Sequence, residues 1–197
     1  PLIRMSQSQA YKLFLLDAMA LIYRAHFAFS KNPRINSKGL NTGVMLGFTN
    51  TLLEVLEKEK PTHIAVAFDT KAPTFRHEQY TPYKANRLEQ PEDITVSIPW
   101  VKEIVRAFKI PVLELDGFEA DDILATLAKS CDFPVQIVSG DRDSFQLIDD
   151  RVTILYPRKG MSDLVHMTPD AVFDKYGVTP KQYRSLAALV GESSDNL

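Results

Sequence analysis

Short apolar runs, most of them ending in aspartate and separated by amphipathic segments, constrain the fold of this chain more than any other feature. The runs lie at residues 12–17, 62–69, 111–116, 135–143 and 152–156. Continuous apolar runs of this length are typical of strands that are buried on both faces. The segments between them, such as 18–29 and 44–58, place apolar residues three and four apart, as amphipathic helices do. This alternation predicts an α/β fold with a mainly parallel central sheet flanked by helices.

Acidic side chains follow these predicted strands at the point where each strand ends. The carboxyl ends of parallel strands meet at one edge of a sheet, which is also where ligands bind. A further acidic stretch at residues 119–122 begins the helix that follows the third strand. We therefore expect the following carboxylates to lie near one another at this edge: Asp17, Asp69, Glu119, Asp121, Asp122, Asp141 and Asp143.

A cluster of carboxylates needs a counter-charge, because ionised carboxylates repel one another and raise each other's pKa. A divalent cation supplies that charge. Oxygen ligands favour Mg²⁺ or Mn²⁺ over zinc, and the four histidines show no ligand spacing. Two such ions can catalyse an in-line displacement at a phosphate ester. The sequence thus predicts a magnesium site suited to phosphate chemistry.

Capping of the helix is an alternative use for the acids at 119–122. Glu119 and Asp122 are three residues apart in a first helical turn, where carboxylates complement the exposed N–H groups and the helix dipole. Aspartate is also a common turn residue after any strand. Both uses stay open for this stretch.

Residues 71–97 interrupt the alternation with a basic, aromatic insert. Lysine and arginine alternate there with aromatic residues, and the set comprises Lys71, Phe75, Arg76, Tyr80, Tyr83, Lys84 and Arg87. Lys84 and Arg87, three apart, are expected on one helical face, where they could clamp a phosphate while Tyr83 stacks on a base. The alternative is a charged loop in solvent.

Composition limits the partners and the compartment. The formal net charge of −2 gives no overall attraction to polyanions, so any nucleic-acid contact must come from a local patch such as the insert. The single cysteine, Cys131, excludes an internal disulfide and is compatible with a reducing cytoplasm. No apolar run approaches the ~18–20 residues of a membrane span. We expect a cytoplasmic protein without membrane contact.

Seven motifs along the chain occur in the order found in one known family. They are Leu-Leu-Asp17, Ala-Phe-Asp69, Phe75-Arg76-His77-Glu78, Tyr83-Lys84-Ala85-Asn86-Arg87, Gly117-Phe118-Glu119-Ala120-Asp121-Asp122, Gly140-Asp141-Arg142-Asp143 and Ser194-Asp195-Asn196. The chain resembles the 5′-nuclease (flap endonuclease) family, and most of all the 5′→3′ exonuclease domain at the amino end of bacterial DNA polymerase I. The resemblance runs from about residue 12 to 197 and implies a PIN-like fold.

The resemblance also implies two metal sites. The first ion would be held or oriented by Asp17, Asp69, Glu119, Asp121 and Asp122, and the second by Asp141, Asp143 and Asp195. Glu192 stands where aspartate is more usual in the family, so it either reaches the second ion through water or changes that ion's affinity.

The basic insert would form a helical arch over the active site. By the resemblance, Lys84 and Arg87 engage the scissile phosphate, Tyr83 lies near the displaced nucleotide, and Arg76 supports them. Lys71 is expected to contact DNA as well.

The expected domain organisation is a tail followed by one catalytic domain. Residues 1–11 form the tail, with Met5 as a candidate natural start, and residues 12–197 form the nuclease domain with the arch at about 71–97. The family continues into a helix-turn-helix element that grips duplex DNA, which we expect this chain to lack. A polymerase domain on the same natural chain is an expected partner.

The function expected from these features is hydrolysis of DNA phosphodiesters by a two-metal 5′→3′ exonuclease or 5′-flap endonuclease. Such an enzyme removes primers or flaps in replication and repair, with Mg²⁺ as cofactor and Mn²⁺ as a substitute. One alternative is a module that binds branched DNA without cutting it. Another is a phosphatase with an aspartate nucleophile, although Asp17-Ala18-Met19 lacks the second aspartate expected two residues on.

Overall fold

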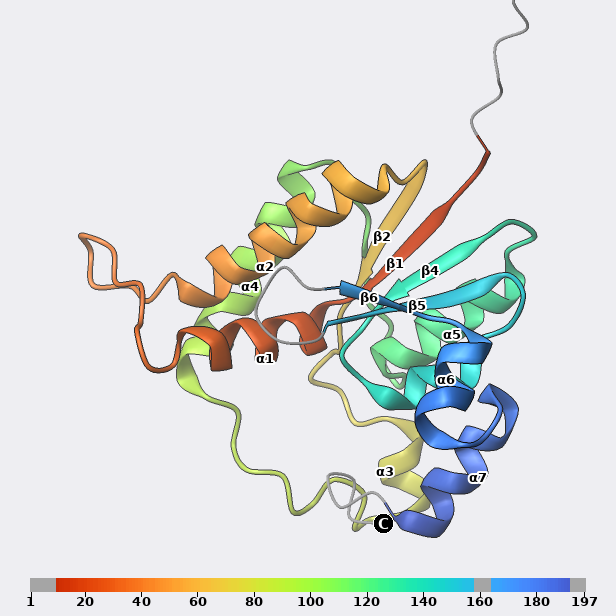
Figure 1. Cartoon of the computed structure of the whole chain (residues 1–197). Helices are drawn as coiled ribbons and strands as arrows, with labels where there is room; N and C mark the ends of the chain where they lie inside the picture. The colour runs from red at the N-terminus through yellow and green to blue at the C-terminus, as the bar shows by residue number, and fades with distance from the viewer. Residues whose placement is uncertain (1–9, 158–163, 192–197) are drawn as a thin grey trace, which may run out of the picture.

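A six-stranded sheet forms the centre of the computed structural model, which describes residues 10–157 and 164–191 (Figure 1). Its strand order is β3-β2-β1-β4-β5-β6. The strands are β1 (Leu13–Asp17), β2 (His63–Ala67), β3 (Val112–Leu113), β4 (Val135–Val138), β5 (Val152–Pro157) and β6 (Leu164–Met167). All neighbouring pairs are parallel except β5 and β6. The expected mainly parallel sheet is confirmed, and the antiparallel β6 is an addition to it.

Two helical layers cover the sheet. One face carries α1 (Ala18–Phe29), α2 (Gly43–Glu54) with its π-helical extension Val55–Glu59, and α4 (Glu92–Ala107). The other carries α5 (Ala120–Ser130), a 3-10 helix (Arg142–Leu147), α6 (Pro169–Tyr176) and α7 (Pro180–Val190). Strand β1 serves both layers, because Phe14 and Leu16 face the first while Leu15 faces the second. This explains why its sequence is apolar at successive positions.

Helix α4 begins earlier than its sequence indicates. Pro99 suggests a first helical turn, where a proline is tolerated, yet the helix starts at Glu92 and Pro99 lies inside it. The buried residues Ile94, Ser97, Val101 and Val105 explain the difference. They follow the three-and-four spacing of a helical face, and burial of Ile94 in the core outweighs the hydrogen bond that Pro99 cannot make.

The insert between β2 and α4 is mostly irregular. It contains one short helix, α3 (Phe75–Gln79), followed by turns over residues 81–86 (Figure 1). Lys84 has a left-handed backbone with φ of 56°, which a helix does not allow. The expectation that Lys84 and Arg87 share a helical face is therefore wrong for this conformation.

The two helices that follow β6 begin and end as their sequences predict. Thr168 and Thr179 are N-caps, with Pro169 and Pro180 at the first helical positions. Gly177 ends α6 in the left-handed conformation with φ of 70°. Among the helices of the described residues, none combines the length and the apolarity that crossing a membrane requires.

The aromatic cluster under α7 gives a test of the packing. The ring of Phe145 lies 5.4 Å from that of Tyr156, 5.9 Å from Tyr176 and 5.5 Å from Tyr183, centroid to centroid. Phe145→Ala should lower the free energy of unfolding by about 3–5 kcal/mol in urea denaturation, because it replaces a fully buried ring with a cavity. Phe173→Ala, at a side chain that is 55% exposed, should change it by less than about 0.5 kcal/mol. Equal losses for the two variants would contradict this account of the core.

Candidate metal and nucleic-acid site

The acids of the site come from three strand ends and one helix start. Asp17 is the last residue of β1, Asp69 follows β2 by two residues, and Asp141 precedes the 3-10 helix after β4. Helix α5 begins directly after Glu119. Asp121 is close enough to Asp17, Asp69, Glu119 and Asp141 for their charges to act on it. The structure thus brings these carboxylates to one edge of the sheet, as the strand pattern indicates.

Asp17 is nearly buried, with 5% of its surface exposed. Its Oδ1 accepts a hydrogen bond from the Ala20 amide at 3.0 Å, and its Oδ2 accepts one from the Ser139 hydroxyl at 2.7 Å. Burial nevertheless raises the pKa of Asp17 to about 6, and the charges of Asp69 and Asp141 add to the rise. Two hydrogen-bond donors thus do not offset the cost of ionising Asp17, and a nearby positive charge would lower its pKa.

Asp121 is more strongly affected. Burial raises its pKa to about 8, and the carboxylates of Asp17, Asp141, Asp69 and Glu119 contribute in that order. The carboxylates of this group cannot all ionise at neutral pH without a counter-charge.

A divalent cation fits this donor set, because carboxylate oxygens are the ligands that Mg²⁺ and Mn²⁺ prefer. The present positions do not form a ready site: over residues 10–157 and 164–191, no three side chains of His, Cys, Asp or Glu are close enough to hold one ion. Basic groups of the insert engage two of the acids instead, as described below.

Glu119 and Asp122 do cap α5. Asp122 Oδ2 accepts a hydrogen bond from the Glu119 amide at 3.0 Å, and the Glu119 side chain accepts one from the Asp122 amide. The capping alternative is therefore correct for these two residues. The Ala120 amide, in the same first turn, donates to Asp69 Oδ1 at 2.6 Å and so fixes Asp69 against the helix start.

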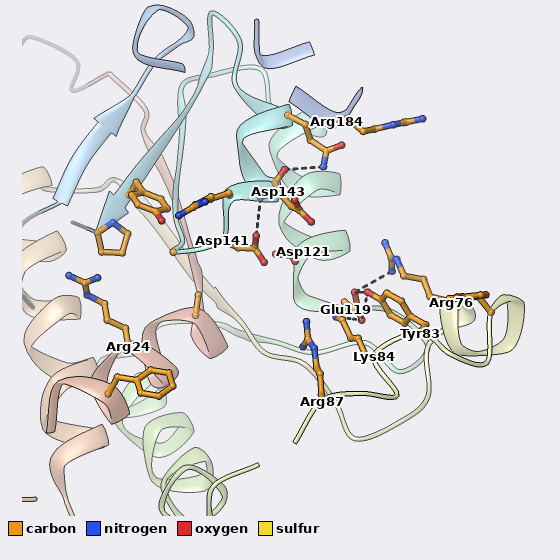
Figure 2. A pocket seen from close by; sticks show the side chains of 18 of the residues that line it. Arg24, Arg76, Tyr83, Lys84, Arg87, Glu119, Asp121, Asp141, Asp143 and Arg184 are labelled. Atoms are coloured by element: carbon orange, nitrogen blue, oxygen red, sulfur yellow. Dashed lines mark hydrogen bonds and ion pairs between the residues drawn. The ribbon is translucent and has the colours of Figure 1, made fainter. Parts of the chain in front are cut away.

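The insert folds onto these caps through three side chains, which Figure 2 shows gathered around Glu119. Arg76 donates to both oxygens of Asp122, each at 2.8 Å, and this pairing holds the pKa of Asp122 below its usual value. Lys84 Nζ lies 2.8 Å from Glu119 Oε1, and the Tyr83 hydroxyl donates to Glu119 Oε2 at 3.0 Å. Tyr83 is only 8% exposed, so its ring cannot stack on a nucleotide in this conformation.

An open cavity of about 1140 Å³ lies between the insert and the rest of the site (Figure 2). Asp121, Asp141 and Asp143 line it together with Lys84 and Arg87 of the insert.

Three arginines that the sequence did not single out line the same cavity. They are Arg24 of α1, Arg142 after β4 and Arg184 of α7. Arg142 stands between Asp141 and Asp143 in the chain, a position that could have marked it. The isolated arginines in α1 and α7 carry no comparable signal.

Other expected site residues lie elsewhere. Lys71 lines a second cavity of about 740 Å³, together with Asp69, Lys102 and Glu114. Glu192 and Asp195 lie outside the described residues.

The raised pKa values predict how the stability of the metal-free chain depends on pH. An unfolded aspartate has a pKa near 3.8, so between about pH 4 and 8 the folded chain binds more protons than the unfolded one. The free energy of unfolding should therefore fall as pH rises through about 6 for Asp17 and about 8 for Asp121. Asp121→Asn removes the larger of these penalties. In a chelator at pH 8 it should be more stable than wild type by more than about 1 kcal/mol, with a smaller difference at pH 5.

The matched control is Asp170→Asn, an exposed aspartate in the first turn of α6. Its stability difference from wild type should not change between pH 5 and 8. A pH profile of Asp121→Asn parallel to that of wild type would contradict the electrostatic account.

Comparisons with known proteins agree with this architecture. Residues 12–177 match the family described as "5'-3' exonuclease, N-terminal resolvase-like domain". DNA polymerase I of Mycobacterium tuberculosis (strain H37Rv) is 48% identical over 188 residues, which cover 94% of this chain and 21% of that protein. DNA polymerase I of Bacillus subtilis (strain 168) is 43% identical over 190 residues, with the same coverage. The chain thus spans about a fifth of the length of these relatives.

Solved structures show the same fold at lower sequence identity. T5 5'-exonuclease with bound divalent zinc ions has a TM-score of 0.72 and 22% identity, over 94% of this chain and 68% of that one. The catalytic core of Rad2 in complex with a DNA substrate has a TM-score of 0.56 and 20% identity, over 95% and 55%. The fold, the acidic edge and the sequence match agree, and this chain belongs to the family of N-terminal resolvase-like domains of 5′-3′ exonucleases.

Proposed function

We propose that this chain is a divalent-metal-dependent nuclease that hydrolyses DNA phosphodiesters as a 5′→3′ exonuclease and 5′-flap endonuclease. The observation that carries the proposal is the group of mutually repelling carboxylates at the carboxyl edge of the sheet. Three of them, Glu119, Asp121 and Asp141, line the same cavity as Lys84 and Arg87. A site that combines metal-binding acids with cations is suited to a polyanionic substrate. Membership of the exonuclease family supports the same reaction class.

Magnesium is the proposed cofactor, as two ions, with Mn²⁺ as a substitute. Asp17, Asp69, Glu119, Asp121 and Asp122 would hold or orient the first ion, and Asp141 and Asp143, with Asp195 and Glu192, the second. When bound, such ions lower the pKa of a water molecule and neutralise the charge that develops on the phosphate. The similarity of fold to a zinc-bound T5 5'-exonuclease supports a divalent-metal site.

The protein's own groups bind and orient the substrate in this scheme. Lys84 and Arg87 would hold the scissile phosphate by charge-assisted hydrogen bonds, and Arg76 would keep α3 fixed through its two bonds to Asp122. Tyr83 would come near the displaced nucleotide only after its hydroxyl leaves Glu119. Lys71, at the second cavity, would contact DNA beyond the cut site.

The proposed substrate is DNA with 5′ ends or 5′ flaps, processed in the removal of primers and flaps during replication and repair. Residues 12–197 form the catalytic domain in this proposal, with the arch insert at about 71–97. A polymerase domain on the same natural chain is a proposed partner, because the relatives named above are DNA polymerases I of about five times this length.

A DNA-binding module without cutting activity is the second candidate. The observation in its favour is that Glu119 and Asp122 are already paired with Lys84 and Arg76, and that no three ligating side chains of the described residues are placed to hold one ion. Binding and cleavage must therefore be measured separately.

Cleavage of a 5′-labelled flap substrate tests the proposal. We expect the chain to cut near the flap junction in Mg²⁺ or Mn²⁺ and not in a chelator, with product lengths read from a gel. Asp121→Asn should lower the single-turnover rate at least about 100-fold, because the bound ions contribute several kcal/mol to the transition state. Its affinity for the flap should stay within a few-fold of wild type.

The control for this assay is again Asp170→Asn, which keeps the carboxylate-to-amide change but lies at the start of α6. It should cut at the wild-type rate. A wild-type rate for Asp121→Asn would overturn the assignment of the acids. Tight flap binding by the wild-type chain with no cleavage in either metal would establish the binding module instead.

A further inference from the structure

The carboxylate of Glu119 is the point where the insert is fastened to the site. It accepts hydrogen bonds from Lys84 Nζ at 2.8 Å, from the Tyr83 hydroxyl at 3.0 Å and from the amide of Asp122. Arg76 NH1 lies 3.6 Å from its second oxygen. Both oxygens of Glu119 therefore accept hydrogen bonds, and two of the donors, Tyr83 and Lys84, belong to the turns that follow α3 in the insert.

The turn segment, defined here as residues 80–87, has little regular structure of its own. Its backbone bonds are single turns, from the amide of Tyr83 to the carbonyl of Tyr80, from Ala85 to Pro82 and from Arg87 to Lys84. Lys84 also holds a left-handed conformation that residues other than glycine seldom adopt. Such a conformation persists where surrounding contacts impose it, and here the side chain of Lys84 is tied to Glu119.

A divalent cation on Glu119 would compete with these contacts. Mg²⁺ binds oxygen ligands at about 2.0–2.1 Å in near-octahedral geometry. An oxygen of Glu119 that accepts a hydrogen bond from Lys84 or Tyr83 would have to give up that bond to come so close to the ion. The ammonium of Lys84, bound to the same carboxylate, would repel the ion across a short distance in a partly buried site. In the same conformation, no three His, Cys, Asp or Glu side chains of the described residues are placed to hold one ion.

The contact between Arg76 and Asp122 differs from the contacts of Glu119. It is bidentate, with both distances at 2.8 Å, and it holds α3 rather than the turn segment. Loss of the Glu119 contacts would therefore release the Tyr83 hydroxyl and the Lys84 ammonium from the site while Arg76 keeps α3 docked.

We propose that Glu119 binds either the turn segment, through Tyr83 and Lys84, or a divalent metal ion, so that metal binding releases the turn segment. The inference rests on the metal site of the proposed function and adds a coupling to it. Tyr83 acts as a positioning residue for Glu119. After release, the ammonium of Lys84 no longer pairs with a carboxylate and faces the open cavity. By reciprocity, whatever weakens the hold of the turn segment on Glu119 must strengthen metal binding.

Hydrogen–deuterium exchange of the DNA-free chain tests the release. The amides of Tyr83, Ala85 and Arg87 report on the turn segment, because each donates one of its backbone bonds. Saturating Mg²⁺ should make these amides exchange about tenfold faster than in a chelator, since their opening no longer has to break the Glu119 contacts. Amides of α5 should not exchange faster. Unchanged or slower exchange at residues 80–87, with Mg²⁺ binding seen by calorimetry, would overturn the inference.

Metal affinity gives the reciprocal test, with free Mn²⁺ measured by electron paramagnetic resonance. Lys84→Met keeps most of the length of the side chain and removes its charge, and Tyr83→Phe removes one donor. The first should tighten Mn²⁺ binding roughly fivefold or more and the second less. The matched control is Lys58→Met, because Lys58, in the π-helical extension of α2, also pairs with a glutamate, Glu54, and it lines neither cavity.

The outcomes separate the two proposals. Unchanged or weaker Mn²⁺ binding by Lys84→Met, or equal tightening by Lys58→Met, would overturn the coupling and leave the metal site intact. Failure of the wild-type chain and of both insert variants to bind Mn²⁺ would overturn the metal site itself, and the coupling with it.

Discussion

Repulsion among buried carboxylates at the carboxyl edge of the sheet is the constraint on which the rest of this structure depends. Parallel strands β1, β2 and β4 all deliver an aspartate to that edge, so their charges meet as a direct result of the topology. Burial and mutual repulsion raise the pKa of Asp17 and of Asp121. Hydrogen-bond donors relieve part of this cost, from the Ser139 hydroxyl to the first turn of α5. The basic insert provides counter-charges for Asp122 and Glu119 and, among the described residues, leaves Asp17 and Asp121 without one.

The sequence predicted the sheet because its signals are local. Each central strand is a continuous apolar run. Such a run can be recognised without knowing which strands pair with it. Strand β6 was missed because Leu164–Met167 is short, pairs antiparallel at the sheet's end and has one buried residue, Met167. The start of α4 was misplaced for the opposite reason. Pro99 is a strong local signal, and a long-range contact, the burial of Ile94 in the core, outweighs it.

In the candidate site, too, local features could be predicted and long-range contacts could not. Convergence of the acids could be predicted, since each follows a strand or begins a helix. The pairing of Arg76 with Asp122 and of Lys84 with Glu119 could not, because 46 and 35 residues separate the partners and the insert has no periodic pattern. The two uses considered for Glu119 and Asp122 are also not exclusive. Capping fixes their side chains at the helix start, and that position places them among the other acids.

The pairing of the insert with the acids bears on how a negative cleft can attract DNA. While Lys84 lies against Glu119, its charge is neutralised by a carboxylate and adds little to the attraction of a phosphate. In the proposed exchange a divalent ion replaces Lys84 at Glu119, so the cleft gains positive charge twice, from the ion and from the released ammonium. The affinity of the insert for DNA then depends on metal binding even where no metal ion touches the DNA. A cluster of acids that would otherwise repel a nucleic acid becomes, by this exchange, the element that makes its cations available.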